Sequence, residues 1–167
     1  ILRLEDTDPK KIEPRFYDDI QDDLRNAGIT FDKLFIESDD LPLYYKYAER
    51  LVGDKKAYVC TCPAESFREL KQKKQACPCR VLDAMAHADR WLGMLRETYK
   101  EGEAVVRLKT DMAHPNPALR DPPLLRIATS HPRRKESVWP LYNFANIVED
   151  HSQGVTHVFS GKEHAHN

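Results

Sequence analysis

The sequence lacks the features of a membrane or secreted protein. It contains no run of about eighteen apolar residues and no basic segment followed by an apolar one near its start, so we expect neither a membrane span nor a signal peptide. It also has no initiator methionine and begins inside an apolar stretch, which suggests a fragment of a longer protein. Hydrophobic residues make up 41% and charged residues 32% of the 167, as is typical of a soluble, cytoplasmic protein with a real core.

Other absences limit the chemistry. The histidines, serines and cysteines show no spacing typical of a Ser-His-Asp or Cys-His-Asn covalent catalyst, and there is no internal repeat or low-complexity run. We therefore look for groups that bind and position a ligand.

The net charge of -1 conceals an asymmetry along the chain. Residues 1–50 hold 8 Lys/Arg and 13 Asp/Glu, residues 51–140 hold 17 and 11, and residues 141–167 hold 1 and 3. A basic middle segment between acidic flanks could bind a phosphate backbone, although a solvated lysine-rich helix around residues 71–74 accounts for part of the excess. Arg107, Lys109, Arg120 and Arg126 are the candidates for phosphate contacts, since they lie along the expected strands and proline loop.

Periodicity predicts a mixture of helices and strands. We expect helices over residues 12–27, 38–53, 65–74 and 81–99 and from Pro140 onward, and strands over residues 1–4, 57–59, 104–109 and 124–127 and at Val155. Gly28 is expected to end the first helix as a glycine stop, and Ser38 is a plausible cap of the second helix. The character changes after residue 53 and returns after 137, so the prediction is an α/β fold in which residues 1–53 and 138–167 form one domain and residues 54–137 form an α+β insert.

Four cysteines stand as two pairs, Cys60-x-Cys62 and Cys77-x-Cys79, with fourteen residues between the pairs. Thiolates bind zinc tetrahedrally, and such a site would stabilise a segment with little apolar core of its own. One-residue gaps are not the commonest zinc spacing, so four reduced thiols remain the alternative, with disulfides least expected in the cytoplasm.

Two groups of polar residues indicate a ligand pocket. Glu5, Asp6 and Asp8 follow the first strand, and ligands of open α/β sheets bind at the carboxyl ends of strands. Asp6 and Asp8 are better interpreted as caps of the turn before Pro9. Tyr142 and Asn146 are four residues apart and so share one helix face, where a phenol and an amide could bind a carboxylate or a carboxamide.

Five segments together resemble the glutamyl-tRNA synthetases of the archaeal and eukaryotic branch, and their relatives the glutaminyl enzymes. They are residues 2–9 (LRLEDTDP), 57–62 (AYVCTC), 102–111 (GEAVVRLKTD), 114–127 (HPNPALRDPPLLRI) and 138–164. The resemblance implies part of a Rossmann-like class I catalytic domain with an inserted acceptor-stem-binding domain. It implies a monomer that uses ATP with Mg²⁺, glutamate and tRNA.

The resemblance also assigns roles to particular residues. In the family, the first acidic residue of the first motif lies beside the α-amino group of the amino acid, which corresponds to Glu5, and the residues matching Tyr142 and Asn146 contact its side chain. Many glutamyl enzymes hold zinc at the segment that matches Cys60, Cys62, Cys77 and Cys79.

Two departures from the family pattern stand out. Ser160 occupies the place of an arginine that contacts the substrate glutamate, which puts carboxylate binding in doubt. The HIGH-type and KMSKS-type segments that bind ATP are absent, so we expect the chain by itself to be inactive. The prediction is a fragment of a glutamate-tRNA ligase; the alternatives are a glutamine-tRNA ligase, a shorter synthetase-like paralogue, and a non-catalytic, zinc-stapled RNA-binding module.

Overall fold

The computed structural model describes residues 1–159 and 161. Within these residues, helices alternate with short strands in no regular order. In chain order the elements are β1 (Leu2–Leu4), α1 (Phe16–Asn26), β2 (Leu34–Ile36), η1 (Glu37–Asp40), α2 (Leu41–Gly53), β3 (Ala57–Cys60), α3 (Ala64–Gln72), η2 (Pro78–Val81), α4 (Ala84–Leu95), β4 (Val105–Leu108), η3 (Pro117–Leu119), β5 (Pro123–Ile127), β6 (Val138–Pro140) and α5 (Tyr142–Ser152), where η denotes a 3₁₀ helix.

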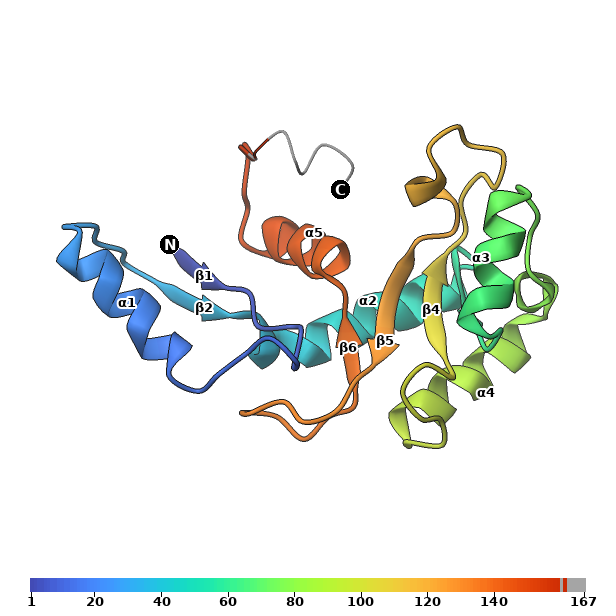
Figure 1. Ribbon diagram of the computed structural model, residues 1–167, viewed down its shortest axis with the longest axis horizontal. Helices are drawn as coiled ribbons and strands as arrows, with labels where there is room; N and C mark the ends of the chain where they lie inside the picture. The colour runs from blue at the N-terminus through green and yellow to red at the C-terminus, as the bar shows by residue number, and fades with distance from the viewer. Residues whose placement is uncertain (160, 162–167) are drawn as a thin grey trace.

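The described strands form two separate sheets. β1 and β2 pair in parallel, with Arg3 opposite Phe35, and α1 connects them. The other sheet is antiparallel in the order β3-β4-β5-β6, with the proline-rich connection and η3 between β4 and β5 (Figure 1). A parallel pair crossed by a helix and an antiparallel meander with helices confirm the expected mixture of α/β and α+β architecture.

One hydrophobic core joins the antiparallel sheet to the helices that flank it. α2 contributes its apolar positions at helical spacing, and α4 and α5 add Trp91, Met94 and Phe144. Trp139 on β6 is fully buried in this core. A smaller cluster surrounds Phe67 and the cysteines. The domain limits near residues 53 and 137 stay a prediction, and α2 and α5, which lie outside those limits, share the larger core with the β3–β6 sheet.

Two helix starts in the described part of the chain are capped by side chains. Asp83 caps α4, its side chain accepting a hydrogen bond from the Ala86 amide at 2.8 Å, and Asn116 does the same for η3 through the Ala118 amide at 2.9 Å. Gly28, at φ 76°, follows α1 in the left-handed conformation that the predicted glycine stop requires.

Three sequence-based expectations were wrong in detail. Pro140 is the last residue of β6 and not part of the helix, because its segment pairs with β5 before the chain turns at Leu141. Residues 155–159 form no strand, since after the turn at Gly154 they pair with none of the described strands. Ser38 does not cap α2; it is buried in η1, and its amide donates to the Asp6 carboxylate.

No helix among the described residues is long and apolar enough to cross a membrane.

Candidate functional site

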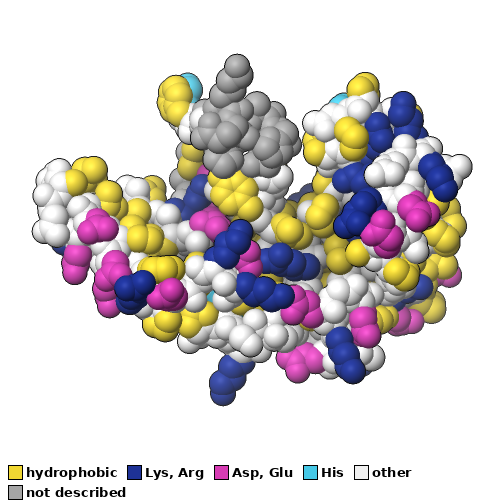
Figure 2. All heavy atoms as spheres, in the orientation of Figure 1, with side chains coloured by type: hydrophobic (Ala, Val, Ile, Leu, Met, Phe, Trp, Pro, Cys, Tyr) yellow, Lys and Arg dark blue, Asp and Glu magenta, His cyan; other side chains and the backbone are white. Residues whose placement is uncertain are grey.

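A large cleft separates α5 from the connection between β4 and β5. Its volume is about 1310 Å³, and Figure 2 shows the molecule hollowed at this place. Its wall includes the turn after β1, the C-terminal half of α2, the proline-rich connection and the first turns of α5. Apolar side chains such as Leu119 and Ile147 lie beside charged ones such as Glu5, Lys11 and Arg126. A concave, mostly apolar surface with a few polar groups is typical of a ligand site.

Glu5 lies in the cleft wall, at the carboxyl end of β1 where the sequence predicted a binding group. It is exposed, and its Oε1 accepts a hydrogen bond from the Thr7 amide at 3.1 Å and another from the Thr7 hydroxyl. These bonds fix the carboxylate while leaving Oε2 for a ligand cation. Glu5 thus has the position and the charge to bind an ammonium group.

Asp6 and Asp8 have structural partners, and the interpretation of Asp6 as a turn cap was wrong because its carboxylate bonds to residues distant in the sequence. Asp6 is buried and accepts from the Tyr17 hydroxyl at 2.6 Å and from the Ser38 amide at 2.7 Å, so it joins β1 to α1 and η1. It also raises the pKa of Tyr17, after the larger effect of burial. Asp8 accepts from the Lys10 amide at 3.4 Å, which agrees with the predicted turn cap, and its carboxylate also lies 2.9 Å from Arg126.

Tyr142 and Asn146 both lie on α5, but only Tyr142 lines the cleft. Tyr142 is about half exposed there, at 47%. Asn146 is half-buried one turn further on, its Nδ2 donating to the Tyr142 carbonyl at 3.0 Å and its Oδ1 accepting from Arg3 at 2.9 Å. The two residues are one helical turn apart, but Tyr142 lines the cleft whereas Asn146 contacts Arg3 of β1, so their joint role in binding stays a prediction.

The sequence did not predict the buried acidic side chain of Glu37. Glu37 is 1% exposed, and neither of its carboxylate oxygens has a hydrogen-bond partner; Arg3 lies 3.4 Å from Oε1. Burial, then the nearby Glu5, raises the pKa of Glu37 to about 8. Glu149 is also buried but is satisfied by the Tyr44 hydroxyl at 2.7 Å and by Gln153 at 2.6 Å. The sequence feature that could have indicated a buried carboxylate was Arg3, because a charged residue between two leucines of an apolar strand needs a partner of opposite charge.

Two of the four predicted phosphate contacts are tied to the protein itself. Arg120 is buried and donates to the carbonyls of His114, Lys71 and Pro115 at 2.7 to 3.0 Å. Arg126 lines the cleft, where it forms the ion pair with Asp8.

The other two basic residues, Arg107 and Lys109, are half-buried near the cysteine pairs. Arg107 stacks on the Phe67 ring at 3.5 Å. Lys109 lies 5.9 Å from the Tyr58 ring, and burial followed by the nearby Arg80 lowers its pKa. The contacts that Arg107 and Lys109 make within the chain do not decide whether they bind RNA. The RNA contacts of all four basic residues therefore stay predictions.

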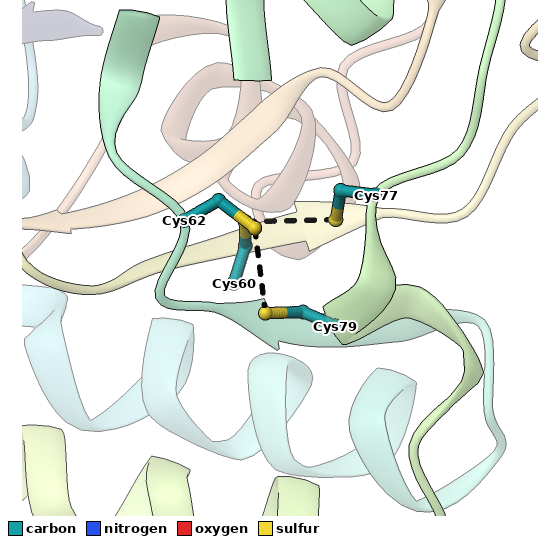
Figure 3. Close-up of side chains that lie close together, drawn as sticks. All are labelled: Cys60, Cys62, Cys77 and Cys79. Carbon is teal, nitrogen blue, oxygen red and sulfur yellow. Dashed lines mark hydrogen bonds between the residues drawn. The ribbon is translucent and has the colours of Figure 1, made fainter. Parts of the chain in front are cut away.

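The cysteine pairs come together as the sequence predicted (Figure 3). Their sulfur atoms all lie within 4.8 Å of one another, with 3.8 Å between Cys60 and Cys77 and 3.6 Å between Cys62 and Cys79. These separations exclude disulfides, whose sulfurs are about 2 Å apart. They match a tetrahedron of thiolates about 2.3 Å from a central zinc ion, whose sulfurs would be roughly 3.8 Å apart.

The electrostatics of the four cysteines differ from one another. The hydrogen bond with Cys77, followed by burial, raises the pKa of Cys60, and burial raises the pKa of Cys62 to about 11. The hydrogen bond with Cys60 lowers the pKa of Cys77 to about 5, which favours the thiolate that a metal requires. The Tyr58 hydroxyl lies 3.5 Å from the same sulfur and donates its hydrogen to Asp121 at 2.9 Å. Three of the four cysteines are buried, and β3 and η2 hold them in place.

Comparison with solved structures supports the fold. A crystal structure of a glutamate tRNA ligase from Elizabethkingia meningosepticum in complex with its amino acid superposes with a TM-score of 0.63 at 19% identity, covering 97% of this chain and 37% of that one. At this identity the similarity concerns the fold alone, and it agrees with the class I synthetase catalytic fold expected from the sequence.

Sequence comparison places the chain more narrowly. The glutamate–tRNA ligase of Thermococcus onnurineus is 56% identical and that of Methanothermobacter marburgensis 48% identical, each across 100% of this chain. The chain spans about 30% of the length of these curated relatives. The family model described as "tRNA synthetases class I (E and Q), catalytic domain" matches residues 1–167. The chain therefore belongs to the family of class I tRNA synthetases for glutamate and glutamine, and lies within their catalytic domain.

Proposed function

We propose that the protein containing this chain is a glutamate-tRNA ligase, which uses ATP to activate glutamate and transfers it to the 3′ end of tRNA(Glu) for protein synthesis. The observation that carries the proposal is the 56% identity, over the whole chain, to archaeal proteins named glutamate–tRNA ligase. The proposal includes the expected cytoplasmic location, a monomeric state, and Mg²⁺ bound with ATP in the intact enzyme.

In this proposal the cleft receives the amino acid and the end of the tRNA. Glu5 binds the α-ammonium group, because its carboxylate faces the cleft and is held by Thr7. The proposed contacts for the side-chain carboxylate of glutamate are Tyr142, which lines the cleft, and Asn146, which lies one helical turn further along α5. Catalysis of this kind depends on positioning and on stabilising charge at phosphates, so these residues act by orientation and not by covalent chemistry.

We further propose that Cys60, Cys62, Cys77 and Cys79 hold a structural zinc ion. Support comes from the sulfur separations, which fit a tetrahedral site. The apolar cluster around the sulfurs is also small: its large buried members among the described residues are Phe67 and Tyr58, with Leu70 packed against them. The metal would supply a rigid link between β3 and η2 and no catalytic chemistry.

The basic insert would bind the acceptor stem without reading its sequence. Arg107, Lys109 and Arg126 are the proposed phosphate contacts with partly exposed side chains. Arg120 would reach a phosphate only by giving up backbone carbonyls, so its contribution would be to hold the proline-rich connection in shape.

The test is tRNA-dependent charging by the intact protein, with labelled glutamate and labelled glutamine offered separately with ATP. Glutamate charging supports the proposal and shows that Ser160, which lies outside the described residues, is tolerated. Glu5→Gln should then raise the KM for glutamate by about tenfold to a hundredfold, as expected for loss of a charged hydrogen bond. Glu13→Gln is the matched control, since Glu13 is an exposed carboxylate paired with Arg15.

A glutamine-tRNA ligase is the second candidate, because the matching family includes enzymes for both amino acids. Charging with glutamine alone would establish it. If neither amino acid is charged, the Ser160→Arg variant is tested next. Continued inactivity would favour a synthetase-like paralogue or a non-catalytic RNA-binding module.

A further inference from the structure

The four sulfur atoms of the cysteine site face one another but differ in their exposure to solvent. Cys60, Cys77 and Cys79 are each at most 7% exposed, whereas Cys62 is partly exposed. Cys60 lies in β3, which is buried along its whole length, and Cys77 and Cys79 lie at η2. Cys62 lies on the segment that connects β3 to α3 (Figure 3). A reagent in solution therefore reaches the sulfur of Cys62 first.

The sulfurs also differ in the polar groups around them. Cys79 accepts a hydrogen bond from the Thr61 amide at 3.5 Å, and the Thr61 hydroxyl lies 3.6 Å from the same sulfur. The Tyr58 hydroxyl lies 3.5 Å from Cys77, and Cys60 is closed off by burial. Within the described part of the chain, the sulfur of Cys62 contacts no hydroxyl or amide in this way, and its neighbour is the Cys79 sulfur at 3.6 Å. The lone pairs of Cys62 are therefore the least engaged by the protein.

We propose that Cys62 is the reactive thiolate of this site, at which soft electrophiles attack and from which loss of the metal begins. The inference rests on the proposed zinc site and adds a reactivity to its structural role. The Cys62 sulfur forms a bond to the electrophilic carbon, and the leaving group departs with the electron pair of the bond that breaks. The thiolate becomes a neutral thioether, so its bond to zinc breaks and three thiolates remain on the metal.

Two alternatives predict a different order of reaction. If the thiols reacted without metal, their acidity would favour Cys77, because the hydrogen bond with Cys60 lowers its pKa to about 5 while burial raises that of Cys62 to about 11. Bound zinc removes this difference, since all four ligands are then thiolates. If the site opened only when the protein unfolds, all four cysteines would react together.

The experiment treats the intact, zinc-loaded protein with iodoacetamide, which is small and uncharged. Mass spectrometry of digested samples locates the modified cysteine, and a coloured zinc chelator records release of the metal. We expect Cys62 to react at least about tenfold faster than each of the other three, at a rate proportional to the reagent concentration. Zinc should be released with the same rate constant, and the other cysteines should react afterwards.

A second measurement separates direct attack from attack after the metal has left. Free zinc added to the buffer should leave the rate at Cys62 unchanged, within about twofold, because the sulfur reacts while it is bound. Ser66→Cys is the matched control, since Ser66 is exposed on α3 and lies outside the site. Alkylation of the added thiol should proceed without release of zinc.

Several outcomes would overturn the inference. These are modification of Cys77 or Cys79 before Cys62, equal rates at all four cysteines, and a rate at Cys62 that falls in proportion to added zinc. Zinc content is measured before the reagent is added, so failure of the metal site is seen separately. A wild-type protein without zinc would refute the proposed site, and this inference with it.

Discussion

Glu37→Gln should stabilise the protein, and the gain should grow with pH. Glu37 is almost completely buried, its carboxylate oxygens lack hydrogen bonds, and its nearest cation, Arg3, is shared with Asp150. Burial is the main cause that raises its pKa to about 8 from the ordinary 4.5, and Glu5, Glu149 and Asp6 add to it. Between these two pH values the folded protein retains a proton that the unfolded chain has released.

The size of the effect follows from this difference in proton binding. Because the folded state binds the extra proton, the contribution of Glu37 to stability is complete below about pH 4.5 and is lost as the pH rises toward 8. The loss is about 1.4 kcal/mol per pH unit where the difference is full, and roughly 2 kcal/mol between pH 6 and pH 8. Glutamine has a similar shape and does not titrate, so it removes this loss.

The assay is urea unfolding at pH 5, 6, 7 and 8, followed by the fluorescence of the buried Trp91 and Trp139. The wild type and Glu37→Gln should be within about 1 kcal/mol of each other at pH 5, and the variant should be more stable by roughly 2 kcal/mol or more at pH 8. Glu13→Gln, an exposed carboxylate, should show no such trend. A difference between Glu37→Gln and wild type that is constant from pH 5 to 8 would refute the reasoning.

Three further perturbations test other parts of the structure. The wild-type protein should bind about one zinc ion per chain, measured by elemental analysis, and Cys77→Ser should abolish this binding and lower the thermal midpoint of unfolding. A wild-type protein that contains no metal and has four reactive thiols would contradict the proposed zinc site. Arg120→Gln should cost about 2 to 3 kcal/mol in urea unfolding because it loses bonds to backbone carbonyls, whereas the exposed Lys73→Gln should be neutral; equal effects would be evidence against the buried role. Leu125→Ala in the centre of β5 should cost about 3 kcal/mol, and a cost below about 1 kcal/mol would mean that this core is not packed as described.

Local patterns in the sequence predicted most of the regular structure. Apolar spacing located α2 and α4, and the glycine after α1 marked its end. The errors came where a partner strand decides the outcome. Pro140 has suitable chemistry for a helix start, but its segment pairs with β5. Val155 and its neighbours have apolar alternation, but a strand also needs hydrogen-bonding neighbours, and the described strands offer them none.

For the candidate site too, the sequence predicts residue types but not the contacts between residues that are distant in the chain. Glu5 and Tyr142 could be selected from the sequence, and they lie in one cleft although they are far apart along the chain. Asn146 could be selected as well, but not the direction of its amide, because that depends on Arg3 at the opposite end of the chain. The burial of Glu37 was likewise not predicted, since a Glu-Ser-Asp-Asp segment is typical of an exposed, polar stretch.

The sequence by itself determined the family, the short-range elements and the four cysteines, because each is encoded in residue types at fixed spacing. Only the tertiary structure decided which of these residues and elements contact one another. It brought the sulfurs of two separate cysteine pairs within 4.8 Å of one another, and it placed Arg3 between a buried carboxylate and the helix that carries Asn146. Burial and the direction of a hydrogen bond depend on residues distant in the sequence, so they appear only when the chain is folded.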